Sequence, residues 1–313
     1  MQQSNHTYTN TGIIMFVFAL IMSLFGCTEG ADYTYIEANA IFGHTASDSS
    51  ERIFLLSGDG LAYVSKTTEE VTETNIPAAS FPQTAGDYVY CQLPAADSDS
   101  DNPNKLELWR FPVDSPYMSH GEKLFEIDSP ERITVADRIY IECVYNDTAS
   151  IDLTGGDARK WNGELHIQTS ADGEYTLVRL DDTGRHSLRL DGKEVCTVDL
   201  NPVADYRFND FMYFSDGICY YIREGTLYSI SSDSAETELI AFEDKASSFE
   251  SAGVFAICGG GVYYHDSDRL FRLDVGTGVT TECKQAYDET SVYFISRDDN
   301  LFRYADNKIE SVE

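Results

Sequence analysis

The chain is poor in cations. Its 313 residues include 22 Lys and Arg against 53 Asp and Glu, so the formal net charge at pH 7 is −31. This balance argues against binding to nucleic acid or to anionic lipid surfaces, because like charges repel. Apolar residues are not scarce, since 42% of the residues are hydrophobic and 12% are aromatic. The chain is therefore too apolar to be disordered, and it is long enough to bury one large all-β core or two ordinary cores.

Familiar catalytic and nucleotide-binding motifs are also missing: the sequence contains no GxSxG, HExxH, P-loop, GxGxxG or CxxC. The six histidines stand far apart in the sequence, at positions 6, 44, 120, 166, 186 and 265. A lone histidine on a strand is most often a hydrogen-bonded surface or core residue. Paired carboxylates, which glycosidases require, give no specific signal where 53 acidic residues always offer some pair. We therefore assign no catalytic residue and no cofactor.

Charged side chains are absent from residues 1–26. Residues 13–25 read IIMFVFALIMSLF, a run that is shorter than the roughly 20 residues needed to cross a bilayer. Such a run is typical of the apolar region of a secretory signal. The next residues complete Leu24-Phe25-Gly26-Cys27, which resembles a bacterial lipobox. That resemblance implies that Cys27 is lipidated and becomes the new N-terminus. An ordinary cleaved signal, or a short buried helix with an incidental cysteine, remains the alternative.

The remaining cysteines stand singly inside apolar, strand-like runs such as DYVYCQL and RIYIECVY. Free cysteine is among the most buried residue types, and a chain of this length does not need disulfides for stability. We therefore expect buried thiols rather than a disulfide framework. The six positions are Cys91, Cys143, Cys196, Cys219, Cys258 and Cys283.

A four-residue unit recurs along the chain: Leu, then an aromatic residue or Val, then Arg or Ser, then an apolar residue. Copies stand at 108–111, 177–180, 227–230, 270–273 and 301–304, with a weaker copy at 61–64. Most copies follow another short apolar run and a turn rich in Asp, Gly or Asn, which indicates β-hairpins. The successive spacings of 47, 69, 50, 43 and 31 residues predict an all-β propeller of four-stranded antiparallel blades.

Two of the repeat units are complete enough to predict all four strands. The first gives strands at 211–215, 218–222, 226–230 and 237–242, and the second at 254–258, 262–266, 270–274 and 279–283.

The gap of 69 residues leaves the blade count open. It holds either an insertion at 146–162 or a blade that has lost its motif. Six blades fit the number of copies, and seven fit the second reading. We expect the segment around 33–42 to pair with the C-terminal strands and latch the ring, because closure removes exposed strand edges.

The repeats resemble those of bacterial lipoproteins that carry a six-bladed propeller related to the YWTD repeats of the LDL-receptor family. The segments RIFLLSGDGLAYV, GVYYHDSDRLFRLD and SVYFISRDDNLFRY carry this resemblance, which covers about residues 50–305. The sequence Y-W-T-D itself does not occur. The resemblance implies a surface-anchored protein that binds or interacts with a partner.

Two stretches are candidate binding sites. Trp161 follows Arg159 and Lys160, and an aromatic residue beside cations suits an interface in an otherwise acidic protein, although packing of this Trp at a strand start is an equal alternative. Carboxylates alternate with serine in the run 97–102, which resembles the start of a calcium loop. An EF-hand would need Gly and Glu where Asn102 and Leu108 stand, so a flexible acidic insertion competes with a weak Ca²⁺ site. The calcium candidates are Asp97, Asp99 and Asp101.

These observations predict a lipoprotein signal peptide at 1–26, a lipid anchor and tether at 27–32, and one propeller domain at 33–313. We expect a monomer, held by its lipid at an extracytoplasmic face of the bacterial cell envelope. It would bind an envelope protein, a peptide or a glycan. The alternative is a propeller hydrolase or lyase that acts on polysaccharide through paired carboxylates.

Overall fold

The structure is a computed structural model that describes most of the chain from residue 39 onward. Its regular elements in this part are β-strands and one short 3-10 helix, η1 (Met118–His120). No helix in this part of the chain is long and apolar enough to cross a membrane. The described residues are 39, 42, 44–57, 60–77, 79–95, 105–128, 132–142, 148–160, 165–169, 175–180, 185–190, 192–199, 212–215, 217–231, 235–242 and 248–312.

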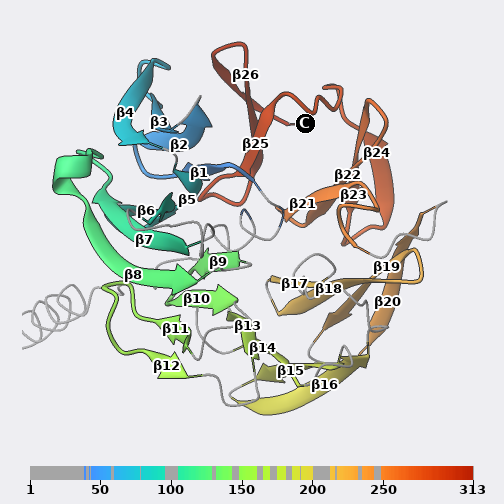
Figure 1. Cartoon of the computed structure of the whole chain (residues 1–313). Coiled ribbons are helices and arrows are strands. Elements are labelled where there is room, and N and C mark those ends of the chain that lie inside the picture. Colours follow the sequence, from blue (N-terminus) through green and yellow to red (C-terminus); the bar gives the residue numbers. More distant parts are fainter. Residues whose placement is uncertain are drawn as a thin grey trace, which may run out of the picture.

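The strands form successive sheets around a ring, which we call blades A to G in chain order (Figure 1). Blade A contains β1 (Ala46–Asp48), β2 (Arg52–Ser57), β3 (Gly60–Ser65) and β4 (Val71–Pro77). Blade B contains β5 (Ser80–Ala85), β6 (Tyr88–Pro94), β7 (Lys105–Pro112) and β8 (Glu122–Asp128). Blade C contains β9 (Arg132–Val135), β10 (Ile139–Glu142), β11 (Thr148–Ile151) and β12 (Arg159–Lys160). Blade D contains β13 (Leu165–Thr169), β14 (Tyr175–Arg179), β15 (Arg185–Leu190) and β16 (Lys193–Asp199).

The second half of the ring continues the pattern. Blade E contains β17 (Met212–Ser215), β18 (Ile218–Arg223), β19 (Thr226–Ser231) and β20 (Glu236–Ala241). Blade F contains β21 (Val254–Cys258), β22 (Gly261–Asp266), β23 (Arg269–Asp274) and β24 (Val279–Glu282). Blade G contains three strands, β25 (Val292–Ile295), β26 (Leu301–Ala305) and β27 (Lys308–Ser311).

Each blade is an antiparallel meander whose first strand lies at the centre of the ring and whose last strand lies at the rim (Figure 1). The first strands β1 and β5, β5 and β9, and β13 and β17 contact each other, and β1 of blade A contacts β25 of blade G, so the first and last blades meet. The predicted all-β propeller of four-stranded antiparallel blades is confirmed. Among the described residues the strands form six four-stranded sheets and one three-stranded sheet, β25–β27. The repeats favour six blades and allow seven.

The repeated leucine explains why these strands stack as blades. This leucine is at most 1% exposed on the third strand of its blade at positions 61, 108, 227 and 270, and Leu301, on β26, the second strand of blade G, is also 1% exposed. Each blade buries both faces against its neighbours, so a central strand carries apolar residues toward two cores at once. The strands predicted for blades E and F match the observed ones to within one residue at either end.

The long gap between motif copies contains a blade, not an insertion. Residues 148–151 and 159–160 form β11 and β12, which complete blade C without a motif leucine. The expectation of an insertion at 146–162 is therefore wrong, and the lost-motif alternative holds. The copy at 177–180 begins on β14, the second strand of blade D, so it is not equivalent to the copies on the third strands of blades A, B, E and F. Leu188 on the third strand, β15, is fully buried and fills the equivalent position.

Polar side chains join the inner strands of neighbouring blades. The Gln83 amide on β5 donates to the carbonyl of Ile133 on β9 and accepts from the Val135 N–H, both at 2.8 Å. The Asn39 amide bonds in the same double manner to the N–H and carbonyl of Ile295 on β25. Each amide thus replaces the peptide group of an absent strand. The predicted pairing of the segment around 33–42 with the C-terminal strands stays a prediction, because residues 33–38, 40 and 41 lie outside the described part; within it, the Asn39 side chain contacts β25.

The five described cysteines, at positions 91, 196, 219, 258 and 283, are free thiols. Cys91, Cys219 and Cys258 are buried, as expected, and burial raises the pKa of Cys91 to about 12. A thiol that stays protonated at neutral pH is a poor nucleophile, so these side chains act as small apolar core residues. Cys143 lies outside the described residues.

Candidate functional site

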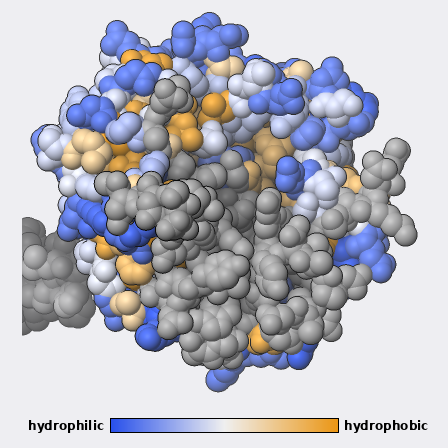
Figure 2. All heavy atoms as spheres, in the orientation of Figure 1, coloured by the Kyte–Doolittle hydropathy of each residue, from blue (hydrophilic) through white to orange (hydrophobic). Residues whose placement is uncertain are grey.

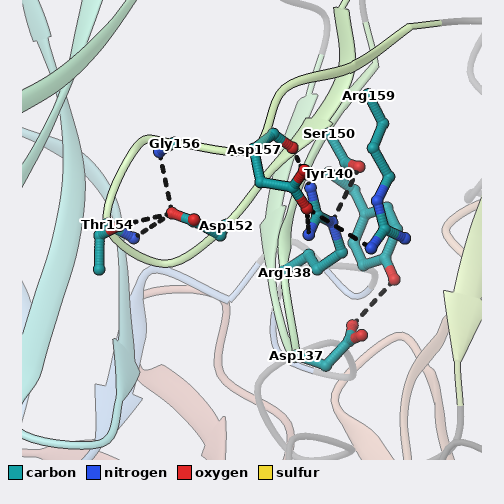
Figure 3. A network of polar contacts seen from close by, with 9 residues as sticks. All are labelled: Asp137, Arg138, Tyr140, Ser150, Asp152, Thr154, Gly156, Asp157 and Arg159. Atoms are coloured by element: carbon teal, nitrogen blue, oxygen red, sulfur yellow. Dashed lines mark hydrogen bonds and ion pairs between the residues drawn. The ribbon is translucent and has the colours of Figure 1, made fainter.

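The rim of blade C carries the most elaborate polar network around the predicted cationic pair (Figure 3). It is built on the turn between β11 and β12. One carboxylate oxygen of Asp152 accepts hydrogen bonds from the Thr154 hydroxyl, the Thr154 N–H and the Gly156 N–H at 2.7, 2.8 and 2.9 Å. These bonds favour the charged form, and the Thr154 hydroxyl is the largest of the causes that lower the pKa of Asp152. The turn is therefore fixed by its own first residue.

Arg138 holds the far end of this turn from beneath. Its side chain is 9% exposed, and its guanidinium donates to a carboxylate oxygen of Asp157 at 2.9 Å, to the Asp157 carbonyl at 2.5 Å and to the Ser150 hydroxyl at 3.2 Å. Asp157 has a φ of 43°, in the left-handed region that aspartate tolerates better than most residues. The buried cation thereby fixes the backbone that leads into β12.

The turn is also tied to the preceding blade. The carbonyl of Leu153 accepts a hydrogen bond from the Tyr90 hydroxyl at 3.1 Å and another from the Arg110 guanidinium at 2.9 Å. Both donors belong to blade B, on β6 and β7. The rim of blade C is thus braced on two sides and presents a rigid edge.

Arg159 and Lys160 form the whole of β12, and both are exposed. The Arg159 guanidinium lies 3.6 Å from the carboxylate of Asp157, and the two side chains are 64% and 63% exposed. A pair this exposed is screened by water and contributes only about 0 to 1 kcal/mol, so Arg159 can exchange this contact for another at little cost. Lys160 pairs across the sheet with Thr148, and Arg159 with Ser150.

Blade C differs from the other blades in the charge of its outermost strand. Every other last strand contains at least one glutamate, namely Glu73 on β4, Glu122 on β8, Glu194 on β16, Glu236 on β20, Glu282 on β24 and Glu310 on β27. Among the described strands at the rim, β12 alone has cations and no carboxylate of its own. Hydrophilic residues cover much of the visible rim, and hydrophobic ones show between them (Figure 2).

The structure thus places two of the residues predicted from the sequence, Arg159 and Lys160, together on an exposed edge. Trp161, the third member of that prediction, lies outside the described residues, as do Cys27 and the calcium candidates Asp97, Asp99 and Asp101. The described residues contain no group of three or more His, Cys, Asp or Glu placed to hold a metal ion.

Sequence reasoning missed Arg138 and Asp157. Arg138 stands in the tight turn between β9 and β10, where an arginine is usually solvated, and nothing in its neighbours indicates burial. The turn residues Asp152, Thr154 and Gly156 do form a recognisable Asx-turn pattern, which would have indicated a fixed loop.

Comparison with known proteins gives the fold. No family model matches this sequence, and no curated protein matches it either. Among solved structures, virginiamycin B lyase from Staphylococcus aureus, as a catalytically inactive variant with quinupristin, has a TM-score of 0.51 at 10% identity, over 85% of this chain and 92% of that one. The selenomethionine form of the same enzyme gives 0.50 at 9% identity, over 87% and 93%.

A second similar structure is the extracellular domain of a putative hybrid two-component system from B. thetaiotaomicron. Its TM-score is 0.52 at 10% identity, and the match covers 88% of this chain and 43% of that one. Identities near 10% do not carry function from one protein to another, because a propeller hosts unrelated activities. The chain is thus a β-propeller that shares its architecture with a lyase and with a sensor domain.

Proposed function

We propose that this protein is a lipid-anchored, extracytoplasmic binding module of the bacterial cell envelope. Its partner is an envelope protein, peptide or glycan, and the contact is made at the rim of blade C through Arg159 and Lys160, with Trp161, the next residue in the sequence, as a further candidate. The apolar run at 13–25 followed by Gly26 and Cys27 supports the anchor. The rigid propeller supports a binding role, because such rings present loops and edges on a fixed scaffold.

The observation that carries the proposal is the positive edge of β12 in a protein of net charge −31. Cations on an edge strand also prevent unwanted strand pairing, but the other rims of this ring combine lysine with glutamate or carry glutamate alone. In blade C the last strand itself carries no carboxylate, and Arg138 holds the turn that leads into it through Asp157. A pre-organised edge loses little conformational entropy on binding.

The geometry of a strand restricts the kind of partner. Successive side chains leave opposite faces of a strand, so Arg159 and Lys160 straddle the edge of the blade. A partner that meets both cations must lie along the edge rather than on one face. An extended acidic peptide, or a glycan that bears carboxylates, has this shape and charge, and the acidic remainder of the surface would repel it from the other edges.

The test compares charge reversals at equivalent places. Beads carrying the wild-type domain, the double variant Arg159→Glu/Lys160→Glu, or the double variant Lys193→Glu/Lys308→Glu are incubated with solubilised bacterial envelopes. Lys193 and Lys308 are exposed on the outermost strands β16 and β27, so the second variant makes the same change in net charge elsewhere on the rim.

We expect the blade C variant to lose a specifically retained partner by about tenfold or more, while the control variant keeps it. Retention should also fall as salt rises, because the contact is ionic. Equal retention by all three proteins would show that this edge is not the binding site. Shortening of an added envelope polysaccharide by the wild-type domain would instead favour a hydrolase or lyase.

A further inference from the structure

Blade G ends at its third strand, β27, whereas the other six sheets of the described structure have a fourth strand. The N–H of Val312, just after β27, donates to the Leu301 carbonyl at 3.0 Å. Because inward and outward backbone groups alternate along an antiparallel pair, the N–H and C=O of Ile309 and Ser311 point away from β26. The Gln285 side chain agrees with this direction, since it donates to the Ser311 carbonyl at 2.8 Å. Ile309 therefore presents its backbone groups at the open edge of the blade.

The side chains of β27 divide between two faces of the blade. Ile309 lies opposite Tyr304 on β26 and packs against the core between blades A and G. Glu310 lies opposite Arg303, whose Nε and Nη2 both donate to its Oε2, at 3.0 and 2.7 Å. Its other oxygen, Oε1, accepts no bond from the described residues, and the Glu310 side chain is 42% exposed. Lys308 shares this face, is exposed, and makes no ion pair with the described residues.

The edge of β27 is complementary to itself in one register. When β27 of a second copy runs antiparallel beside it with the two Ile309 residues opposite, each Ile309 donates to the other and accepts from it. Lys308 of each copy then lies opposite Glu310 of the other, in the closer pairs of the ladder. A shift by two residues places either Lys308 opposite Lys308 or Glu310 opposite Glu310, and like charges repel. Charge therefore selects the register that is centred on Ile309.

The other rim strands in the described part of the chain lack this pattern. The strands β4, β20 and β24 carry glutamate without a cation, and β12 carries cations without a carboxylate, so each would repel a copy of itself. On β8, Lys123 is already paired with Glu107 and Glu126. On β16, Lys193 and Glu194 are adjacent in the strand and so lie on opposite faces.

We propose that β27 is a dimerisation edge, at which three strands from each of two copies join into one antiparallel sheet. On one face, each row of charges then alternates from Arg303 to Glu310 to Lys308 of the second copy. On the other face, Tyr304 and Ile309 of both copies form a continuous apolar row. The contact is small and each copy has a net charge of −31, so the dimer is weak and forms where salt screens this repulsion, at a Debye length of about 8 Å.

Dimerisation at blade G leaves the cationic edge of blade C accessible. The strand β12 lies on the far side of the ring from blade G (Figure 1). A dimer therefore carries two β12 edges, and a partner with repeated sites gains avidity by binding both. The dimer itself does not depend on what binds at blade C.

Sedimentation equilibrium of the full chain tests the dimer, in a detergent matched in density to the solvent so that a lipid anchor does not interfere. The samples are the wild type, Lys308→Glu, Glu310→Lys and an equimolar mixture of these two variants. Each single variant turns two attractive pairs into two repulsive ones, so we expect its association constant to fall by about tenfold or more. The mixture should recover the association, because glutamates at 308 and 310 of one copy then face lysines of the other.

A control variant separates the local pairs from net charge. Lys193→Glu makes the same change in charge as Lys308→Glu on another rim strand, and it should associate as the wild type does. The proposal fails if the wild type stays monomeric, if Lys308→Glu associates as well as the wild type, or if the mixture of folded variants does not recover. If Glu310→Lys does not fold, because it loses the Arg303 pair, the comparison of Lys308→Glu with Lys193→Glu decides: equal association overturns the dimer.

Discussion

Two arginines approach the carboxylate of Asp157, and their surroundings differ. The Arg138 side chain is 9% exposed, whereas that of Arg159 is 64% exposed. A buried guanidinium that loses its partners pays a desolvation penalty, while an exposed one turns to water. The first arginine therefore has a structural role in fixing the turn, and the second is available to a partner at little energetic cost.

This difference predicts unequal costs for the same change. Arg138→Met should lower the free energy of unfolding by about 2 to 3 kcal/mol, because it leaves the Ser150 hydroxyl and the Asp157 carbonyl without their donor. Arg159→Met should change it by less than about 1 kcal/mol. Urea denaturation of the two variants measures both values. Equal losses would mean that Arg138 is solvated and does not hold the turn.

At the scale of the strand, the repeated leucine is buried between neighbouring blades and forms part of the hydrophobic core. In blades A, B, E and F it lies on the third strand, between two strands of its own blade. In blade F, Leu270 on β23 is 1% exposed, and Val279 on the adjacent rim strand β24 is 58% exposed. The position of an apolar side chain across the blade, more than its residue type, therefore determines how much it contributes to the free energy of unfolding.

Truncation of these two residues tests that statement. Leu270→Ala removes buried methyl groups and leaves a cavity, so we expect a loss of about 2 to 5 kcal/mol in the free energy of unfolding. Val279→Ala should stay within about 0.5 kcal/mol of the wild type. Chemical denaturation followed by tryptophan fluorescence gives both numbers. A small effect of Leu270→Ala would contradict the sealing role of the repeat.

The sequence predicts the strands well where leucine, an aromatic residue and a turn recur together, as in blades E and F. It fails in blade C, where the third strand β11 reads TASI and offers no leucine to align. The motif at 177–180 misleads because a central second strand needs the same apolar residues as a third strand. The cationic pair at 159–160 was visible in the sequence as an exception to the acidic background.

Other features could not be predicted because they depend on contacts that are remote along the chain. Asn39 and Ile295 are 256 residues apart, and no local pattern marks an asparagine that will replace a peptide group. Arg138 depends on a turn that begins at Asp152, and its burial follows from that packing alone. The alternation of side chains along a strand can be seen in the local sequence, whereas the residues that meet across the ring cannot.

At the scale of the whole molecule, a closed ring of strongly negative net charge would be held at a membrane by one residue if the lipobox is used. Bilayer attachment would then come from acyl chains, each methylene of which contributes about 0.8 kcal/mol, and not from the protein surface, which anionic lipids repel. The propeller would stay in solution while its anchor stays in the bilayer.

This arrangement predicts the outcome of metabolic labelling. The full-length chain expressed in a bacterium with a tagged fatty acid should take up the label and sediment with membranes. Cys27→Ser should do neither, because its hydroxyl is not a substrate for thioether formation. Cys283→Ser, which changes a half-buried thiol of the propeller, should behave as the wild type. Label on the Cys27→Ser protein would show that the anchor is elsewhere.

The two ends of the ring meet where the Asn39 side chain bonds to Ile295 of β25, so the ring closes only after most of the chain has been made. Asn39 is among the first propeller residues to leave the ribosome, and its partner Ile295 follows 256 residues later. At about 5 to 20 residues per second, that interval is roughly 10 to 50 seconds. Throughout it the nascent ring is an open arc with unsealed ends, so completion must wait for the last two hairpins. Export or chaperone binding that delays premature collapse would suit a chain whose beginning and end must meet.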